Sequence, residues 1–193
     1  MIYAKDKIIL VDCDGVLLDW IFAFERYQET KGLKLADPSV YDVAKRYNTS
    51  LEQGLIDIQT FNDSAAIGFL PPLMDAVYYV RRLYMKHGYR FHVISSVSLD
   101  THAHRLRIMN LEMLFGKDVF DGFTFEACGA SKTKALSKWE GSECYWIEDL
   151  NNNAEEGEQF GLDPLLVAHP WNADSQYPRF PKWKNIYRHI VDA

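Results

Sequence analysis

The sequence predicts an α/β fold in which helices flank a mostly parallel sheet. Short apolar runs alternate along the chain with stretches whose apolar residues recur every three to four positions, which are the patterns of buried strands and of helices. Acidic or hydroxyl residues directly follow three of the apolar runs. Because open parallel sheets bind ligands at the carboxyl ends of their strands, this placement predicts a polar site at one edge of the sheet.

The first predicted element is a strand at 7–11, where KIILV is a short apolar run rich in β-branched residues. Residues 20–31 follow a three-to-four spacing and predict a helix. Shorter amphipathic helical pieces are expected at 41–47 and 51–58. A serine before the second piece and a glutamine three residues later predict a capping box at its start.

After two consecutive prolines, residues 73–84 carry an apolar helical stripe, and Gly88 is well placed to end that helix. YRFHVI at 89–94 predicts a second buried strand, and the next helix is expected at 99–114 with Ser98 as its N-cap. One face of that helix carries Leu99, Ala103, Leu106, Met109 and Met113. The remaining strands are predicted at 122–126, 144–147 and 165–168, and the remaining helices at 132–139, 151–160 and 183–191.

Length and composition limit the classes of function. The 193 residues suffice for one full core, and 48% apolar with 25% charged residues is typical of a soluble globular protein. A net charge of −6 argues against binding a nucleic-acid polymer, which relies on many Lys and Arg contacts. Three widely spaced cysteines argue against a disulfide framework. With no signal-peptide pattern and no apolar run of membrane length, we expect a cytoplasmic protein without a membrane partner.

Two aspartates follow the first predicted strand, in DCDGV at 12–16. Alternate residues at a strand end can direct both Asp12 and Asp14 towards one crevice, where two carboxylates repel and need a cation or a proton. Mg²⁺ suits them, because it takes oxygen ligands and leaves positions open for phosphate. Asp and Gly also favour turns for local reasons, so the motif alone leaves both interpretations open.

Three further features place polar groups near strand ends or helix starts. Glu148 and Asp149 follow the apolar run YWI, and Ser95 and Ser96 follow FHVI. A hydroxyl at such a position can donate to a phosphate oxygen. Lys132 opens a helix, where its ammonium can act as a point charge for phosphate. Taken singly, each also fits a solvated turn, a helix cap or a surface lysine.

The order of these motifs resembles that of the haloacid dehalogenase (HAD) superfamily of phosphohydrolases. The resemblance covers the whole chain and is strongest in VDCDGV at 11–16 and WIEDLNNN at 146–153. It implies a Rossmann-like parallel sheet flanked by helices, with a small helical cap inserted after the first strand. Residues 1–19 and 71–193 would then form the core domain and residues 20–70, a segment too long for a loop, the cap.

The resemblance also implies a mechanism. Asp12 would be the nucleophile that forms an aspartyl-phosphate, and Asp14 the general acid and base. Ser95 and Lys132 would surround the phosphoryl oxygens, with Ser96 as a further substrate contact. Ser95 stands where threonine is commoner, which retains the hydroxyl. Lys134 competes for the role of Lys132, which we prefer because a leucine follows it at the family's usual interval.

The implied cofactor is Mg²⁺. The resemblance assigns it to the Asp12 carboxylate, the Asp14 backbone carbonyl and Asp149. Glu148 occupies a position that varies in the family, so it either supports these ligands or contacts the ion itself. Backbone N–H groups near Gly15 would add to the phosphate cradle.

Two smaller similarities point to one branch of the superfamily, the 5′(3′)-deoxyribonucleotidases. They are FNDS at 61–64 with FLPP at 69–72, and HPWN at 169–172 near the end of the chain. They imply a nucleoside monophosphate as substrate. Glu148 replaces an aspartate of that branch, which leaves the subfamily open. The alternatives are a phosphatase for a sugar phosphate or a phosphoserine-like metabolite, and a non-catalytic HAD-fold binding protein.

The cap segment is rich in aromatic residues that could stack on a base. Phe22, Phe24 and Phe69 are the first candidates, although each could instead belong to the cap's own core. The expected partner is therefore a small phosphorylated metabolite. The sequence leaves open whether the chain forms a homodimer.

Overall fold

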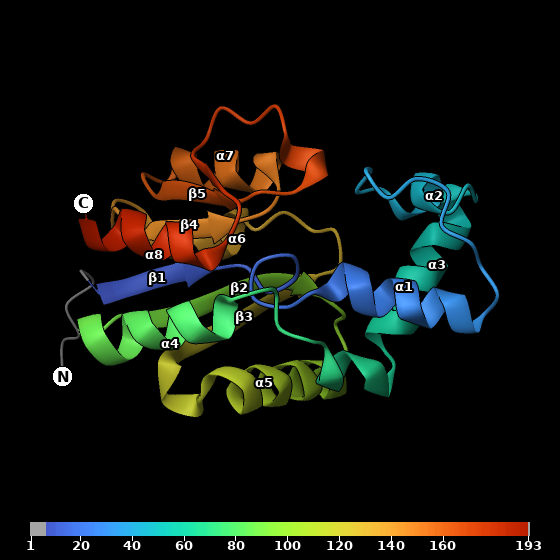
Figure 1. Ribbon diagram of the computed structural model, residues 1–193, viewed down its shortest axis with the longest axis horizontal. Helices are drawn as coiled ribbons and strands as arrows, with labels where there is room; N and C mark the ends of the chain where they lie inside the picture. Colours follow the sequence, from blue (N-terminus) through green and yellow to red (C-terminus); the bar gives the residue numbers. More distant parts are fainter. Residues whose placement is uncertain (1–6, 193) are drawn as a thin grey trace.

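The computed structural model describes residues 7–192, and their core is a six-stranded sheet in the order β3-β2-β1-β4-β5-β6 (Figure 1). Every neighbouring pair of strands is parallel, which confirms the predicted α/β class. The first six residues of the predicted core domain lie outside the described range. The strands are β1 Ile8–Val11, β2 Arg90–Val97, β3 Phe120–Ala127, β4 Tyr145–Glu148, β5 Asp163–Val167 and β6 Arg179–Phe180.

The strand order fixes where a ligand can bind. The chain proceeds outward from β1 through β2 to β3, and then returns to the other side of β1 to form β4. Such a reversal opens a crevice at the carboxyl ends of the two strands that flank it. Here those strands are β1, which leads into Asp12, and β4, which leads into Asp149.

Helices cover both faces of the sheet (Figure 1). Side chains alternate along β1: Ile9 and Val11 belong to one buried cluster, and Ile8 and Leu10 to the other. The first cluster includes side chains of α4 (Ala76–His87), α5 (Thr101–Phe115) and α8 (Trp183–Asp192). On the other face lie α6 (Thr133–Leu136) and α7 (Asn151–Gln159). Across residues 7–192, no helix has both the length and the apolar character that a membrane crossing requires.

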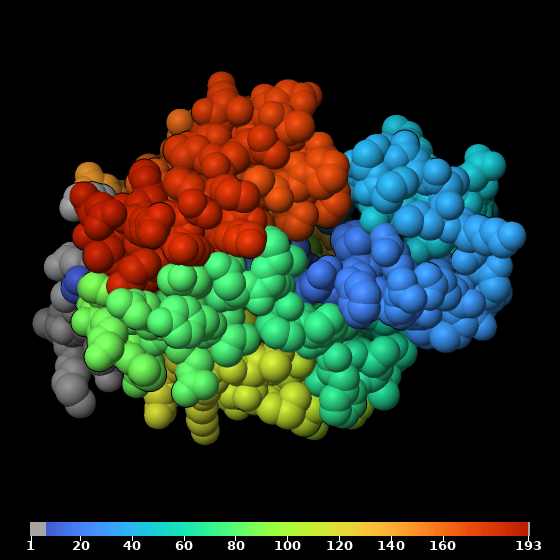
Figure 2. All heavy atoms as spheres, in the orientation of Figure 1, coloured from blue at the N-terminus to red at the C-terminus, as the bar shows by residue number. Residues whose placement is uncertain are grey.

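The segment after β1 forms a small helical layer beyond the carboxyl edge of the sheet (Figure 1). It contains α1 (Trp20–Thr30), α2 (Val43–Arg46) and α3 (Leu51–Asn62). We use the term cap for residues 20–70. Trp20 stacks on Phe24 with ring centroids 4.6 Å apart, and Phe61 packs edge-on against both, so the cap has an aromatic core of its own. Figure 2 shows the cap, blue to cyan, meeting the C-terminal part of the chain along a seam.

Local signals that set helix ends are confirmed in several places. The Ser50 hydroxyl accepts the Gln53 backbone N–H at 3.1 Å and caps α3. Only this half of the predicted capping box is present, because the Gln53 amide instead donates to Asp57. Gly88 ends α4 in the left-handed conformation, with φ of 74°. Between Ala65 and Asn172, the main elements are connected by the 3₁₀ segments η2 Ala65–Phe69, η3 Lys117–Val119, η4 Ser137–Trp139 and η5 Pro170–Asn172.

The start of α5 differs from the prediction. Its N-cap is Asp100, which accepts the His102 backbone N–H at 2.8 Å. Ser98 lies two residues earlier and accepts the Asp100 N–H instead. A carboxylate and a hydroxyl cap equally well, so position along the chain rather than side-chain chemistry decides which residue is used.

The predicted apolar face of α5 is also wrong in part. Leu99, Met109 and Met113 are 73%, 42% and 62% exposed. The buried side chains of this helix are instead Ala103, Arg107, Asn110, Leu111 and Phe115. This buried stripe contains two polar residues, so a search for a helical pattern of apolar residues alone does not find it.

Candidate active site

The loop after β1 brings Asp12 to the carboxyl edge of the sheet, where the side chain is nearly buried. Gly15 in this loop has a φ of 75°, which favours glycine. A Cβ at Gly15 would lie 2.4 Å from Oδ2 of Asp149, so only glycine lets the Asp149 carboxylate approach the loop. The space left by Gly15, which we call the glycine cradle, therefore lets the acidic residues that follow β1 and β4 lie close together.

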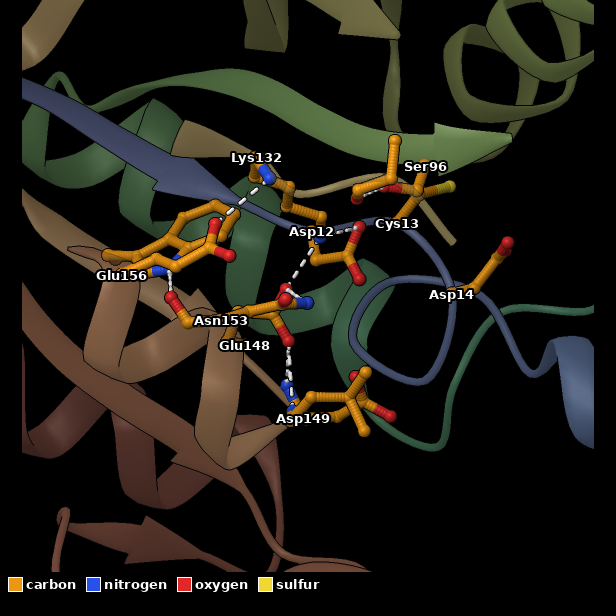
Figure 3. A network of polar contacts seen from close by, with 12 residues as sticks. Asp12, Cys13, Asp14, Ser96, Lys132, Glu148, Asp149, Asn153 and Glu156 are labelled. Atoms are coloured by element: carbon orange, nitrogen blue, oxygen red, sulfur yellow. Dashed lines mark hydrogen bonds and ion pairs between the residues drawn. The ribbon is translucent and has the colours of Figure 1, made fainter. Parts of the chain in front are cut away.

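Lys132 belongs to a buried network of polar contacts (Figure 3). Its Nζ lies 2.9 Å from Oδ1 of Asp12 and 2.5 Å from Oε1 of Glu148. The start of α6 is held in place by Glu156, whose carboxylate accepts the Lys132 backbone N–H at 2.9 Å. Burial lowers the pKa of Lys132, but the two facing carboxylates more than offset this, so the net effect raises it. The lysine therefore stays charged.

Both oxygens of Glu148 are fully engaged. Oε1 accepts from Lys132 and from the Asn153 amide at 2.7 Å, and Oε2 accepts the backbone N–H groups of Asp149 and Leu150 at 2.7 and 2.9 Å. Glu148 is completely buried. This arrangement favours a role in orienting Lys132 and the loop after β4 over direct contact with an ion.

The acidic cluster fits a divalent cation. Ligand atoms of Asp12, Glu148 and Asp149 lie within 4.8 Å of one another. Burial raises the pKa of Asp12 to about 6, and the neighbouring carboxylates of Glu148 and Asp14 add to the effect. Burial, then Glu148 and Asp12, raises the pKa of Asp149 well above its ordinary value. A bound cation would relieve this cost, and an all-oxygen donor set is suited to Mg²⁺.

Asp14 points away from this cluster (Figure 3). Its carboxylate forms a two-pronged ion pair with Arg107 of α5, in which Nη2 lies 3.2 Å from Oδ2 and Nη1 contacts Oδ1. Burial raises the pKa of Asp14, and the guanidinium opposes that rise. Arg107 was not among the site residues predicted from the sequence. Its position four residues after Ala103 and four before Leu111, both buried, is the signal that could have found it.

A cavity of about 440 Å³ lies between the sheet edge and the cap. All four predicted catalytic residues line it: Asp12, Asp14, Ser95 and Lys132. Gly15, Ser96 and Asp149 also line it, and the Ser96 hydroxyl donates to the Ala130 carbonyl at 3.1 Å. The structure therefore gathers these predicted residues, from four separate parts of the chain, around one space.

The predicted aromatic contacts need correction, because none of the three phenylalanines lines this cavity. Phe24 is fully buried between Trp20 and Phe61 in the cap's aromatic core. Phe22 lies on another face of α1, 47% exposed, beneath the guanidinium of Arg26. Phe69 is 67% exposed on η2. Successive residues of a helix diverge by about 100°, so the neighbours of a lining residue face elsewhere.

The cap lines the cavity mainly with apolar side chains. Leu51, Leu55 and Ile58 of α3 recur at helical spacing and face the space, joined by Ile21 of α1. The α3 helix was predicted from the sequence, but the position of its apolar stripe at the site was not. Aliphatic residues at that spacing usually form a core, and only the position of the helix over the sheet edge shows otherwise.

The segment HPWN at 169–172 contacts the two loops that carry the site residues. The His169 ring contacts the Gly15 carbonyl through Nε2 at 2.7 Å, and Nε2 therefore carries the proton. The Trp171 indole and the Asn172 amide donate to the Asp149 carbonyl at 3.2 and 2.8 Å. Trp171 also packs against Tyr41 of the cap, with ring centroids 5.7 Å apart. This segment therefore links the loop after β1, the loop after β4 and the cap.

Comparison with protein-family models found no match to the chain. The chain is 26% identical over 184 residues to the uncharacterized 32.4 kDa protein of the Gp30-rIII intergenic region of Enterobacteria phage T4. That match covers 90% of this chain, which spans 63% of the length of the phage protein.

Solved structures show a wider likeness. A haloacid dehalogenase-like family hydrolase from Streptococcus pneumoniae aligns with a TM-score of 0.66 at 14% identity, covering 97% of this chain and 100% of that one. A HAD family hydrolase from Deinococcus radiodurans R1, with bound phosphate and sodium, aligns at 0.62 and 16%, covering 98% and 97%. The HAD-hydrolase candidate YfnB from Bacillus subtilis, bound to magnesium, aligns at 0.60 and 13%, covering 97% and 99%.

At these identities the likeness establishes the fold. The neighbours match this chain over nearly its whole length, sheet and inserted helices together. The chain therefore has the fold of the haloacid dehalogenase superfamily of hydrolases, with a buried acidic cluster at the edge where such a sheet binds ligands.

Proposed function

We propose that the protein is a Mg²⁺-dependent phosphomonoester hydrolase that works through an aspartyl-phosphate on Asp12. The observation that carries this proposal is the arrangement at the cavity floor. There the Asp12 carboxylate faces the cavity, a buried ammonium lies 2.9 Å away, and Asp149 is brought close by a glycine cradle. Nucleophile, cation site and phosphate-binding groups thus surround one space.

The chemistry proceeds in two steps. An Asp12 oxygen attacks phosphorus, the bond from phosphorus to the ester oxygen breaks, and Asp14 gives its proton to the departing oxygen. A water molecule then attacks the phosphorus of the aspartyl-phosphate and loses a proton to Asp14, which regenerates the Asp12 carboxylate and releases inorganic phosphate. Lys132 and the Ser95 hydroxyl bind phosphoryl oxygens throughout. Mg²⁺, held by Asp12, Asp149 and the Asp14 carbonyl, would neutralise charge on the transferring group.

The residues that line the cavity favour a substrate with a single phosphate and a largely apolar organic part. Among the described residues that line it, Lys132 is the one cationic side chain, and it is already committed to the reacting phosphate. A second phosphate would meet the aliphatic wall of α3 or the acidic Asp42. A nucleoside monophosphate suits this space, because its base has apolar faces for Leu55 and Tyr41 and polar edges for Asn62. We therefore propose a 5′(3′)-deoxyribonucleotidase-like activity, with residues 20–70 acting as the cap that excludes water.

Phosphate release from a substrate panel tests this proposal. The panel contains deoxynucleoside and ribonucleoside monophosphates, sugar phosphates, phosphoserine and 4-nitrophenyl phosphate, each with Mg²⁺ and with EDTA. We expect metal-dependent release that favours deoxynucleotides, and none from Asp12→Asn. A preference for sugar phosphates or phosphoserine would overturn the substrate class alone. No metal-dependent release from any compound would overturn the phosphatase itself and favour a binding protein.

A further inference from the structure

Arg107 is a charged side chain in the core that the proposed mechanism does not yet use. It is fully buried on α5, a helix that carries none of the predicted catalytic residues. Its two terminal nitrogens meet the two carboxylate oxygens of Asp14, and Nη1 also lies 3.6 Å from Sγ of Cys13. Within residues 7–192 its Nε has no hydrogen-bond partner. The described part of the chain thus offers this buried cation a single carboxylate, that of Asp14.

We propose that Arg107 is the positioning residue for Asp14, and that its two-pronged ion pair holds the general acid and base at the cavity wall. This inference rests on the phosphatase function proposed above. A planar guanidinium that binds both oxygens fixes the plane of a carboxylate as well as its place, which a lysine could not do. Asp14 needs such an anchor, because its side chain is 23% exposed to the cavity and has two rotatable bonds.

The position of this anchor matters because a competing site lies close by. Asp14 is two residues from Asp12, which lies in the acidic cluster with Glu148 and Asp149. A free Asp14 carboxylate would be attracted to a cation in that cluster. Arg107 lies on α5 and binds both oxygens of the Asp14 carboxylate. That carboxylate points away from the cluster (Figure 3). The ion pair therefore keeps Asp14 available to the leaving group.

A buried ion pair can also serve stability alone, and the leaving group separates the two roles. A general acid matters most when the departing oxygen is strongly basic, and little when the leaving group is stable as an anion. Phenyl phosphate and 4-nitrophenyl phosphate have similar shapes, but the nitrophenol leaves far more readily without a proton. Loss of positioning therefore lowers kcat/KM for phenyl phosphate selectively, whereas loss of folded protein lowers kcat/KM for both equally.

The experiment measures kcat/KM for both phosphates, with Mg²⁺, in Arg107→Gln, Arg107→Lys and Asp14→Asn, because kcat/KM reports the step that releases the leaving group and excludes the later hydrolysis that both substrates share. We expect Arg107→Gln to lose on the order of 100-fold in kcat/KM with phenyl phosphate and less than about tenfold with 4-nitrophenyl phosphate. Arg107→Lys should show a smaller loss with the same selectivity, and it keeps a buried cation should the Gln variant fail to fold. Asp14→Asn should show the selectivity in full, and adding Arg107→Gln to it should cost little more. Arg105→Gln, an exposed arginine on the same helix, is the matched control and should match the wild type.

Equal losses of kcat/KM with the two phosphates in the Arg107 variants, or a gain in kcat/KM, would overturn the proposal. The proposal would also be overturned if the losses caused by the Arg107 and Asp14 substitutions were fully additive in the double variant. Failure of the proposed function is a different result, because the wild-type protein itself would then release no phosphate from either compound.

Discussion

At the scale of single residues, the site depends on how closely two loops approach. Gly15 belongs to the loop after β1, and Asp149 follows β4. The space for a side chain at position 15 is already filled by the Asp149 carboxylate. Asp12 and Asp149 can therefore hold one cation between them only if residue 15 has no Cβ.

Gly15→Ala should weaken Mg²⁺ binding strongly, because the new Cβ displaces the Asp149 carboxylate. It should also lower stability by about 1 kcal/mol through its positive φ. The measurement is the rise in melting temperature as Mg²⁺ is added. Gly88→Ala is the matched control, since Gly88 has a φ of 74° with nothing within 4 Å of a Cβ. It should lose similar stability and keep the full response to Mg²⁺; a normal response in Gly15→Ala would contradict the assignment of the cradle.

Residue types and spacing predicted much of this arrangement of side chains. The acids after β1 and β4 and the lysine at α6 could be identified from the sequence because each follows or opens a regular element. Arg107 and the phenylalanines show where such inference ends. In the sequence, only the apolar residues four positions before and after Arg107 distinguish it from a surface arginine, and its partner Asp14 is evident only in the folded chain. Phe24 faces the cap's core rather than the cavity because of how α1 packs against α3.

At the scale of elements, α3 determines what the cavity accepts beyond the phosphate. Its inward stripe of Leu51, Leu55 and Ile58 offers apolar surface and no charge. Adjacent residues of the same helix face solvent, so the helix itself supplies matched positions for testing this role.

Leu55→Lys should shift substrate preference towards compounds with a second phosphate, because it places a cation on an apolar wall of the cavity. We expect the ratio of kcat/KM for a deoxynucleoside 3′,5′-bisphosphate to that for the 5′-monophosphate to rise about tenfold, equivalent to roughly 1.4 kcal/mol. Ile56→Lys is the control: Ile56 is 50% exposed against 56% for Leu55, but it does not line the cavity. An equal shift in both variants, or none in Leu55→Lys, would show that α3 does not face the leaving group.

At the scale of the whole molecule, burying carboxylates at one edge of the sheet has an electrostatic cost for the stability of the fold. Alternation of strands and helices predicted the parallel sheet, and the reversal of strand order between β1 and β4 explains why the acids meet there. Burying them raises the pKa of Asp12 to about 6 and that of Asp149 well above its ordinary value. Without a bound metal ion, the protein should therefore be least stable at pH values at which these carboxyl groups are ionised.

The pH dependence of stability tests this cost. A raised pKa means that the folded state binds protons more tightly than the unfolded chain, so Asp12 contributes a loss of stability as pH rises from about 4 to about 6. Asp12→Asn cannot ionise, so its free energy of unfolding should gain on that of the wild type across this window, with both measured in EDTA by urea denaturation. Mg²⁺ should stabilise the wild type more at pH 7 than at pH 5. A difference between variant and wild type that stays constant with pH would contradict the raised pKa.

The most direct test of the central claim is to look for the phosphoryl group on Asp12. Wild-type protein is mixed with its best substrate from the panel and Mg²⁺, quenched in acid within milliseconds, digested and analysed by mass spectrometry. We expect one acid-stable, alkali-labile phosphoryl group on the peptide that contains Asp12, and none in Asp12→Asn. Phosphate release in the wild type without this label, or turnover retained in Asp12→Asn, would contradict the proposed mechanism.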